Sequence, residues 1–341
     1  MKKHVFAPYI MEDTVNDLRV NDILRITHLN IAFGLIRDDH TVTVDHLQYI
    51  NRIPAYKRLN PDLRVNLSIG GWGADGFSQM AFTKEGRDAF VSSAMDIVAK
   101  FEFDGIDIDW EYPCIDSAEI ACHPSDKQNF TFLMEELRAG LDELSKQTNK
   151  YYELSCAVGG EEYFIQNTEM DKIAAIVDYV NLMTYDLRGG FTNVTGHHTN
   201  LYPQIGEPNG PCGERTVQLY HDAGVPYEKM VLGAAFYGRR WSGVSGGDTH
   251  GLGQPASSVG NIRMDFDLQD PQAIAQHHFT KFWDDQAKAA YLYDGADFIS
   301  YETPESICEK CKFVREKKLA GLMYWSYGNH TLFEAVDTYL D

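Results

Sequence analysis

Three carboxylic acids alternate with apolar residues in the segment FDGIDIDWEYP, residues 103–113. Asp107, Asp109 and Glu111 occupy every second position, and a β-strand projects alternate side chains to the same face. If this segment is a strand, the three carboxyls form one row, with no Arg or Lys nearby in the sequence to neutralise them. Acids this close can share protons, so that one is held neutral while another is charged. A carboxyl that stays protonated near neutral pH can act as a general acid, and Glu111 at the end of the strand is the one a substrate could reach.

The elements that must position this row alternate along the chain. Eight apolar, β-branched segments are expected to be strands, at residues 4–9, 26–33, 63–69, 103–111, 152–158, 177–185, 230–237 and 319–325. Helical patterns fall between them, for example at 85–101 and at 126–147, where apolar residues recur at helical spacing. Eight strands that alternate with helices predict an α/β fold, a parallel (β/α)8 TIM barrel.

One interval is too long for a single helix. Between the seventh and eighth expected strands the chain carries Gly-rich sequence, then an aromatic segment, and then a helical pattern at 304–317. We therefore expect a barrel made of residues 1–238 and 303–341, with a small α+β insertion at 239–302. Connections that follow barrel strands emerge at the catalytic face, so the insertion should form a wall of the cleft that holds Glu111. Its aromatic residues should supply a small core of their own.

Other strand ends carry residue types that are unusual for a barrel core. The expected strand ends place aromatic rings at Tyr9, Phe33, Trp72, Tyr185, Tyr237 and Trp325. Any one of these rings is at least as readily explained as ordinary core. Their coincidence around one barrel mouth, together with carboxyls, favours a carbohydrate site in which sugar faces stack on rings. Gly70 and Gly71 would let the backbone approach a ligand closely.

Composition excludes several other functions. The chain has 341 residues and a formal net charge of -20, which argues against nucleic acid as a partner. It contains no apolar run long enough to span a membrane. The first residues lack a secretory apolar region, so the chain is either leaderless or has lost a leader, and its localisation stays open. We expect a monomer.

Cysteine and histidine patterns indicate no metal site. The six cysteines are scattered, and the motif CEKC at 308–311 has no second cysteine pair. The pairs His197-His198 and His277-His278 are adjacent in sequence, unlike the i, i+4 spacing of a helical zinc site. We expect these histidines to be solvated loop or helix residues, and we expect no metal and no cofactor.

Several motifs together resemble those of glycoside hydrolase family 18, the chitinase family. DGIDIDWE matches the family pattern D-x-x-D-x-D-x-E, SIGGW (68–72) its S-x-G-G motif, and MTYD (183–186) its sixth-strand motif. FYGRRW (236–241) is similar to the end of its seventh strand, and GLMYWSYGN (321–329) to its eighth-strand Trp segment. The matches follow the family's order over nearly the whole chain. The long interval resembles the α+β insertion of the deep-cleft chitinase subfamily.

The resemblance implies roles for the acid row. Glu111 would protonate the glycosidic oxygen, and Asp109 would orient and stabilise the N-acetyl group of the substrate. Asp107 would hold the proton of Asp109, supported by Ser68. Asp104 lies on the other face of the expected strand, and we expect it to be structural.

The resemblance also implies a set of substrate-binding residues. Tyr185 would bond to the acetamido carbonyl, with Asp186 and Met183 alongside, and Trp325 would form the floor under the sugar at the cleavage point. An arginine that reaches this point would be Arg239, Arg240 or Arg263, and we expect Arg239. The complete expected binding set is Tyr9, Phe33, Gly70, Gly71, Trp72, Met183, Asp186, Tyr237, Arg239 and Trp325.

The implied activity is that of a chitinase, a retaining glycosidase that cleaves β-1,4-N-acetylglucosaminide bonds with the help of the substrate's own N-acetyl group. Two alternatives stay open: a related N-acetylglucosaminidase acting on N-glycan or peptidoglycan, and a non-catalytic chitin-binding lectin. The presence of Glu111 argues against the lectin. The family also implies non-proline cis peptides at Ala32–Phe33, Glu111–Tyr112 and Trp325–Ser326.

Overall fold

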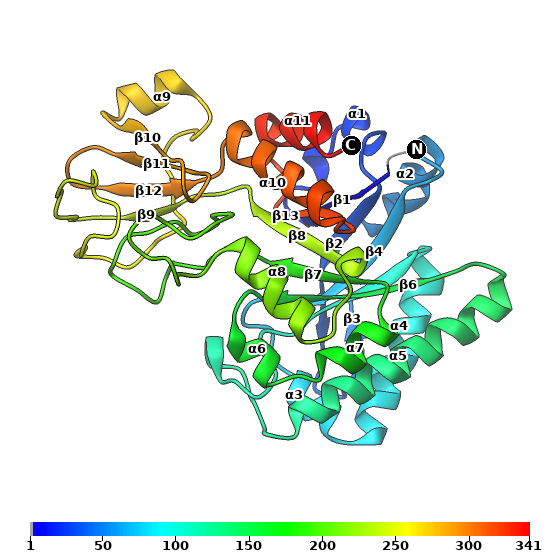
Figure 1. Cartoon of the computed structure of the whole chain (residues 1–341). Coiled ribbons are helices and arrows are strands. Elements are labelled where there is room, and N and C mark those ends of the chain that lie inside the picture. The colour runs from blue at the N-terminus through cyan, green and yellow to red at the C-terminus, as the bar shows by residue number, and fades with distance from the viewer. Residues whose placement is uncertain (1–2) are drawn as a thin grey trace.

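A computed structural model describes residues 3–341 and shows a closed barrel of eight parallel strands (Figure 1). The strands are β1 (Val5–Met11), β2 (His28–Ile36), β4 (Arg64–Gly70), β5 (Gly105–Asp109), β6 (Glu153–Gly159), β7 (Tyr179–Met183), β8 (Met230–Ala235) and β13 (Gly321–Trp325). Each strand pairs with its neighbours in this order, and β1 pairs with both β2 and β13, which closes the ring. A short strand, β3 (Val42–Thr43), pairs antiparallel with β2. All eight strands expected from the sequence are therefore confirmed, with ends that differ by up to three residues.

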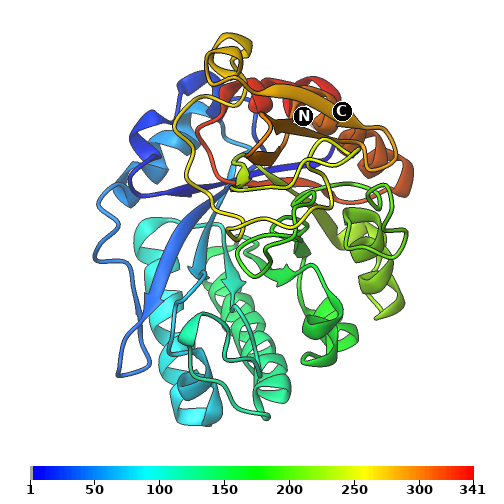
Figure 2. The ribbon, with the colours of Figure 1, turned by 90° about the vertical axis from the view of Figure 1, so that its left-hand side faces the viewer.

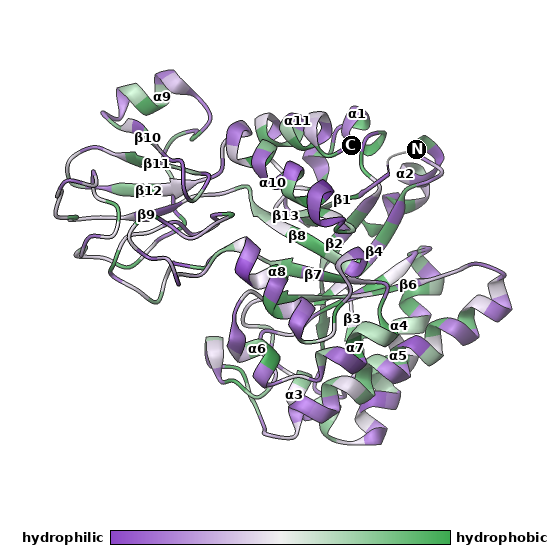
Figure 3. Ribbon diagram, in the orientation of Figure 1, coloured by the Kyte–Doolittle hydropathy of each residue, from purple (hydrophilic) through white to green (hydrophobic). Residues whose placement is uncertain are grey.

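Helices cover the outside of the barrel. They are α1 (Val20–Ile23), α2 (Ile53–Leu59), α3 (Phe77–Phe82), α4 (Lys84–Phe101), α5 (Asp126–Thr148), α6 (Glu162–Gln166), α7 (Met170–Ile176), α8 (Gly213–Asp222), α10 (Pro304–Lys317) and α11 (His330–Tyr339). Short 3-10 turns lie at Val15–Asp17, Ile50–Arg52, Ser117–Glu119 and Tyr227–Lys229. Figure 3 shows largely hydrophobic barrel strands and helices whose surfaces alternate between hydrophobic and hydrophilic.

Sequence signals explain where the long helices begin and end. Thr83 caps α4 by accepting a hydrogen bond from the backbone N–H of Gly86, and the helix ends where Glu102 adopts a left-handed conformation. In α5 the residues Leu133, Leu137 and Leu141 recur on one face and are fully buried. These faces pack on the outside of the strands and form the main hydrophobic core, while a smaller apolar cluster fills the barrel interior.

A second sheet lies between β8 and β13 in the sequence. It has four antiparallel strands in the order β10 (Thr280–Asp284), β11 (Ala289–Tyr293), β12 (Phe298–Tyr301) and β9 (Arg239–Trp241), with the helix α9 (Pro271–Gln276). Each face of this sheet has its own apolar cluster, one centred on Trp241 and the other on Leu292, as expected from the aromatic content. Figure 2 shows this segment, in yellow and orange, in front of one part of the barrel. The domain boundaries at 238/239 and 302/303 stay predictions.

The connection from β7 to α8 packs against the insertion. The indole N–H of Trp241 donates to the carbonyl of Thr192 at 3.0 Å, and the N–H of Thr195 donates to the carbonyl of Gln254 at 2.9 Å. His197 and His198 lie in this connection and are 2% and 0% exposed, so the expectation that they are solvated is wrong. They are buried because segments distant in sequence cover them. His277 and His278, at the end of α9, are exposed as expected.

Within residues 3–341 no helix has the length and apolar character needed to cross a membrane. The same residues contain no group of three or more His, Cys, Asp or Glu side chains placed to hold a metal ion, and all six cysteines are free.

Candidate active site

The acid row lies inside the barrel, and Asp107 at its base is the best-bonded member. Its carboxylate is fully buried and accepts four hydrogen bonds. They come from the hydroxyls of Tyr9 (2.9 Å), Ser68 (2.8 Å) and Ser155 (2.6 Å) and from the amide of Asn181 (3.0 Å). Burial raises the pKa of Asp107, and these four donors oppose that rise. The donors come from β1, β4, β6 and β7, so the barrel converges on this one side chain.

Asp109 lies one step above Asp107 in the row and lacks comparable support. It is 4% exposed, and one of its carboxyl oxygens is buried without a hydrogen-bond partner. Burial, and then the negative charges of Glu111 and Asp107, raise the pKa of Asp109 well above its ordinary value. Asp109 therefore holds a proton more readily than an aspartate in water does.

Glu111 lies two residues beyond the end of β5 and is half-buried. Burial is the main cause that raises the pKa of Glu111 to about 7; the charge of Asp186 adds to the rise, and a hydrogen bond with Tyr112 opposes it. Among residues 3–341, no Arg, Lys or His forms an ion pair with any of the three acids. Glu111 can therefore be protonated near neutral pH, as a general acid requires.

Asp104 is separate from this row, as expected. It is buried at the start of the strand and forms ion pairs with Lys57 at 2.7 Å and Lys150 at 2.6 Å. Its carboxylate also accepts the backbone N–H of Val65. These contacts give Asp104 a structural role.

Tyr185 and Asp186 follow β7 on the side of the site nearest the insertion. The ring of Tyr185 lies edge-on to Tyr237 at 6.3 Å, and Asp186 has a left-handed backbone with φ of 55°. Nε of Arg239 donates to Oδ1 of Asp186 at 2.6 Å. Burial alone would raise the pKa of Asp186, but His198 and Arg239 outweigh it and hold the pKa below the ordinary value. Asp186 is therefore a fixed negative charge beside Glu111.

Of the three candidate arginines, the structure brings Arg239 to the site. Arg240 instead pairs with Asp297 at 2.7 Å and Asp265 at 3.2 Å within the insertion. Arg263 is exposed. Arg239 also donates to the carbonyl of Gly260 at 3.0 Å, which ties the insertion to the edge of the site.

Trp325 and Phe33 form an aromatic floor. Their rings stack with centroids 5.4 Å apart and an angle of 18°, and Tyr9 lies 6.0 Å from Trp325. Tyr9 is 2% exposed and Met183 is 8% exposed within the barrel interior. The structure therefore places Tyr9 beneath the site, as a partner of Asp107, and places Met183 beneath Tyr185. Direct contact of these two side chains with a substrate stays a prediction.

Gly70 and Gly71 leave no room for a side chain. Both have positive φ, at 121° and 93°, and the N–H of Gly71 donates to the carbonyl of Asp109 at 2.8 Å. A Cβ at Gly70 would lie 2.0 Å from that same carbonyl oxygen, and one at Gly71 would lie 2.6 Å from the ring of Phe33. The two glycines hold β4 close to the acid row and to the aromatic floor.

Two exposed aromatic rings lie at the edge of the site. Trp72 is 53% exposed and Phe191 is 83% exposed, and their centroids are 5.9 Å apart. Trp72 also lies edge-on to Tyr112 at 6.3 Å. Sequence reasoning included Trp72 but missed Phe191. The sequence could have indicated Phe191 by its position, since it lies six residues after Tyr185 and directly after Gly189-Gly190.

Sequence reasoning also missed two polar side chains at the acid row. Ser155 and Asn181 both donate hydrogen bonds to Asp107. Ser155 and Asn181 are single polar residues inside apolar strands, and such residues alone are a weak indication of a functional site. The indication becomes strong only in the structure, where the strand register places Ser155 opposite Asp107.

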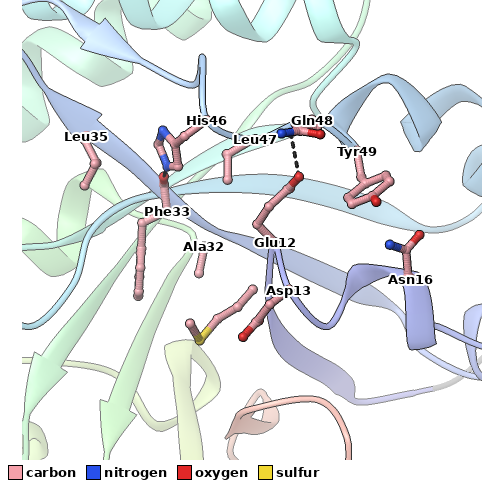
Figure 4. A pocket seen from close by; sticks show the side chains of 11 residues that line it. Glu12, Asp13, Asn16, Ala32, Phe33, Leu35, His46, Leu47, Gln48 and Tyr49 are labelled. Atoms are coloured by element: carbon pink, nitrogen blue, oxygen red, sulfur yellow. Dashed lines mark hydrogen bonds between the residues drawn. The ribbon is translucent and has the colours of Figure 1, made fainter.

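A pocket of about 660 Å³ continues from Phe33 along the ends of β1 and β2 (Figure 4). Glu12 accepts the backbone N–H of Gln48 at 2.7 Å, and the ring of His46 bonds the carbonyl of Phe33 at 2.9 Å. The site is therefore open beyond the aromatic floor on the β1–β2 side.

The three non-proline cis peptides that the sequence resemblance implies are present. They are Ala32–Phe33, Glu111–Tyr112 and Trp325–Ser326.

Comparisons with known proteins identify the family of the chain. The family model described as "Glycosyl hydrolases family 18" matches residues 5–329. Chitinase A1 of Niallia circulans is 38% identical over 292 residues, which cover 81% of this chain and 42% of that protein. Chitinase 1 of Aphanocladium album is 33% identical over 283 residues, covering 81% of this chain and 64% of that protein. The chain thus spans from under half to just under two thirds of the length of these relatives.

A solved structure matches over its full length. The glycoside hydrolase family 18 N-acetylglucosaminidase from Paenibacillus barengoltzii superimposes with a TM-score of 0.93 at 42% identity, covering 98% of this chain and 99% of that one. The family model, these relatives and this structural match lead to one conclusion. The chain belongs to glycosyl hydrolases family 18.

Proposed function

We propose that the protein hydrolyses β-1,4-N-acetylglucosaminide bonds in chitin and chito-oligosaccharides. The observation that carries this proposal is Glu111, whose pKa is raised to about 7 at the top of a buried row of acids. Family membership and the chitinases among its relatives support the same reaction. The intact acid row supports an enzyme over a chitin-binding lectin.

Substrate assistance explains the one-sided arrangement of these acids. A retaining glycosidase with its own nucleophile places two carboxyls about 5–5.5 Å apart across the sugar. Here Asp107, Asp109 and Glu111 rise from one strand. In the proposed reaction Glu111 gives its proton to the leaving glycosidic oxygen, while the acetamido carbonyl oxygen bonds to the anomeric carbon and forms an oxazolinium ion. Water then attacks the anomeric carbon, Glu111 takes the water's proton, and the acetamido group is restored with retention of configuration.

The remaining residues would position the acetamido group and the sugar ring. Asp109, protonated and flanked by Asp107, would donate to or orient the acetamido group. Tyr185 would donate its hydroxyl to the acetamido oxygen, and Asp186 would accept from the substrate beside it. The stacked pair of Trp325 and Phe33 would carry the apolar face of the sugar, with Trp72 and Phe191 contacting units farther along.

The test of this proposal is a substrate comparison. Purified protein is given chito-oligosaccharides, fully deacetylated chitosan oligomers, peptidoglycan and a high-mannose glycopeptide, with Glu111→Gln as the inactive control. Hydrolysis of the N-acetylated oligomers, with the β-anomer formed first by NMR, is the expected result. Equal hydrolysis of deacetylated oligomers would refute substrate assistance, because glucosamine has no acetamido nucleophile. If only peptidoglycan or only the glycopeptide were hydrolysed, that polymer and not chitin would be the substrate.

A second candidate activity is the release of single N-acetylglucosamine units from chain ends. The observation that favours it is the match in length and fold to the N-acetylglucosaminidase from Paenibacillus barengoltzii. Product analysis on tetra- to hexasaccharides separates the two activities. Monosaccharide as the first product supports chain-end release, while disaccharide and longer products support chitinase action.

A further inference from the structure

His198 is a buried polar residue that the roles above leave unexplained. Its side chain is fully buried, and neither ring nitrogen has a hydrogen-bond partner that meets ordinary criteria. Nδ1 lies 3.5 Å from Oδ1 of Asp186, at the outer limit of hydrogen-bond distance. The imidazole ring also lies 5.2 Å from the ring of Tyr237. A buried N–H without an acceptor is costly, so the position of His198 beside a carboxylate requires a reason.

The backbone around His198 is fixed from two sides. The N–H of His198 donates to Oγ of Ser300 in the insertion at 3.0 Å, and its carbonyl accepts the N–H of Leu187 at 3.1 Å. The preceding His197 lies 3.3 Å from Asp284, which is also in the insertion. The imidazole therefore has little freedom to turn away from Asp186.

The next residue anchors the same loop to the barrel. Thr199 donates to Glu302 at 2.8 Å and accepts from the buried ammonium of Lys310 in α10 at 2.7 Å. The ammonium of Lys310 also lies 2.5 Å from Glu302. Because each of these groups is at most 3% exposed, the anchor is shielded from solvent.

Asp186 needs such support. Its backbone is left-handed, and its side chain remains 39% exposed at the site. Arg239 bonds Oδ1 from the side of the insertion at 2.6 Å. An aspartate held by one partner can rotate about its own side-chain bonds, whereas a second donor to the same carboxylate restricts it.

We propose that neutral His198 is a positioning residue that donates Nδ1–H to Asp186 and, together with Arg239, holds this carboxylate in the orientation that binds the substrate beside Tyr185. The substrate part of this statement rests on the proposed function.

The surroundings of His198 favour the neutral ring. The charged and titratable groups that face it are Asp186 after β7, Tyr237 and Arg239 after β8, and Glu302 after β12. Burial lowers the pKa of His198, and the charge of Arg239 lowers it further, whereas Asp186 and Glu302 oppose the change. Asp186 meanwhile stays ionised because its pKa is held below the ordinary value.

Three variants test the donor directly. Asn at position 198 keeps a neutral N–H near the place of Nδ1, whereas Leu fills a similar volume without a donor. We expect His198→Leu to lower kcat/KM on tetra-N-acetylchitotetraose about tenfold and His198→Asn to restore most of it. His221→Leu, the same change at an exposed histidine in α8, is the control. If packing were the role of His198, Leu would match or exceed Asn, and that result would overturn the proposal.

A double-mutant cycle tests whether His198 acts through Asp186. With Asp186→Ala as background, His198→Leu should change kcat/KM by less than twofold, because the group it positions is absent. A full tenfold loss in this background would refute the coupling.

The ring itself provides a readout that does not depend on activity. In protein labelled with ¹⁵N-histidine, the resonance absent from His198→Asn identifies His198. We expect a neutral Nδ1–H tautomer from pH 6 to 8, with a hydrogen-bonded proton shift that is lost in Asp186→Ala. An Nε2–H tautomer, or an ordinary titration near pH 6.5, would contradict the proposal. If the wild type hydrolysed no oligosaccharide, the proposed function would fail while this measurement would still decide the role of His198.

Discussion

Burial raises the pKa of Glu111 more than the neighbouring negative charge does. The two nearest acids of the row differ in support, because Asp107 has four donors while Asp109 has an unpartnered oxygen. A proton in the row is therefore expected on Asp109 and Glu111 before Asp107. With the protons in this order, Asp107 is the ionised carboxylate at the bottom of the row and Glu111 is the protonated carboxyl at its reactive end.

The pH dependence of activity should follow Glu111. A general acid must be protonated in the free enzyme, so kcat/KM on a chito-oligosaccharide should be constant on the acidic side of pH 7 and fall above it. The expected midpoint is about 7, the raised pKa of Glu111. The measurement is kcat/KM from pH 4 to 9 with stability checked at each pH. A kcat/KM that stays constant up to pH 9 would assign the proton transfer to a different group.

The same raised pKa predicts a stability effect. A carboxyl whose pKa rises from 4.5 to about 7 on folding binds its proton more tightly in the folded state. Its contribution to the free energy of unfolding is complete below pH 4.5 and is lost as the pH rises from 4.5 to 7. Glu111→Gln, which cannot ionise, should therefore raise the melting temperature at pH 8 and leave it nearly unchanged at pH 4. Equal shifts at both pH values would show that the buried charge is not the cause.

At the residue scale, the sequence predicted the acids but only part of their environment. Alternation alone placed Asp107, Asp109 and Glu111 on one face. Ser68 followed from the family motif, but Ser155 and Asn181 could not be assigned because their inward direction depends on the barrel register. Contacts between side chains on neighbouring strands can be predicted only when the strand register is known, and a single sequence does not give the register.

At the scale of elements, the strands were predictable and the β7–α8 connection was not. Strands buried on both faces leave continuous apolar runs in the sequence, and all eight were found. His197 and His198 in this connection were expected to be solvated, because their adjacent spacing does not fit a helical zinc site. Their burial depends on partners such as Asp284 and Ser300, which are about a hundred residues away along the chain.

The end of β4 offers a matched pair of glycine substitutions. Gly71 and Gly73 both have positive φ, at 93° and 78°, but a Cβ at Gly73 meets nothing within 4 Å while one at Gly71 meets Phe33 at 2.6 Å. Gly73→Ala should cost about 1–2 kcal/mol of stability from backbone conformation alone. Gly71→Ala should cost about 1 kcal/mol more and should also raise KM, because Phe33 is displaced from Trp325. Thermal unfolding and oligosaccharide kinetics measure the two effects. Equal behaviour of both variants would show that Phe33 adapts without loss.

At the scale of the whole molecule, the insertion and the barrel meet at the candidate site. Arg239, at the start of the insertion, bonds Asp186 of the barrel and the carbonyl of Gly260. The N–H of Gly260 in turn donates to the carbonyl of Gly189 at 3.2 Å. The residues at 259–263 therefore run along the edge of the site. Val259 and Ile262 on this segment are 45% and 58% exposed.

This geometry allows a local test of the expected cleft wall. Replacement of the whole segment 243–300 would also remove Asp284 and Ser300, which face His197 and His198, so its effects would not be confined to the cleft. A point substitution of an exposed apolar residue avoids this problem. Ile262 is 58% exposed and lies two residues from Gly260, to which Arg239 donates, so Ile262→Ser changes mainly exposed surface.

We expect Ile262→Ser to weaken binding of N-acetylated hexasaccharide about threefold to tenfold, because apolar surface that covers the distal sugars is lost. Binding of the disaccharide should change little, since in the proposed site it would occupy the aromatic floor and the acid row and would not reach Ile262. The control is Leu24→Ser, which is 53% exposed just ahead of β2 and thus at the opposite end of the barrel. Calorimetric titration of both oligosaccharides, in the background of Glu111→Gln to prevent hydrolysis, gives the two affinities. An equal loss for both oligosaccharides would place Ile262 at the cleavage point, and no loss for either would show that the insertion does not line the path of the sugar chain.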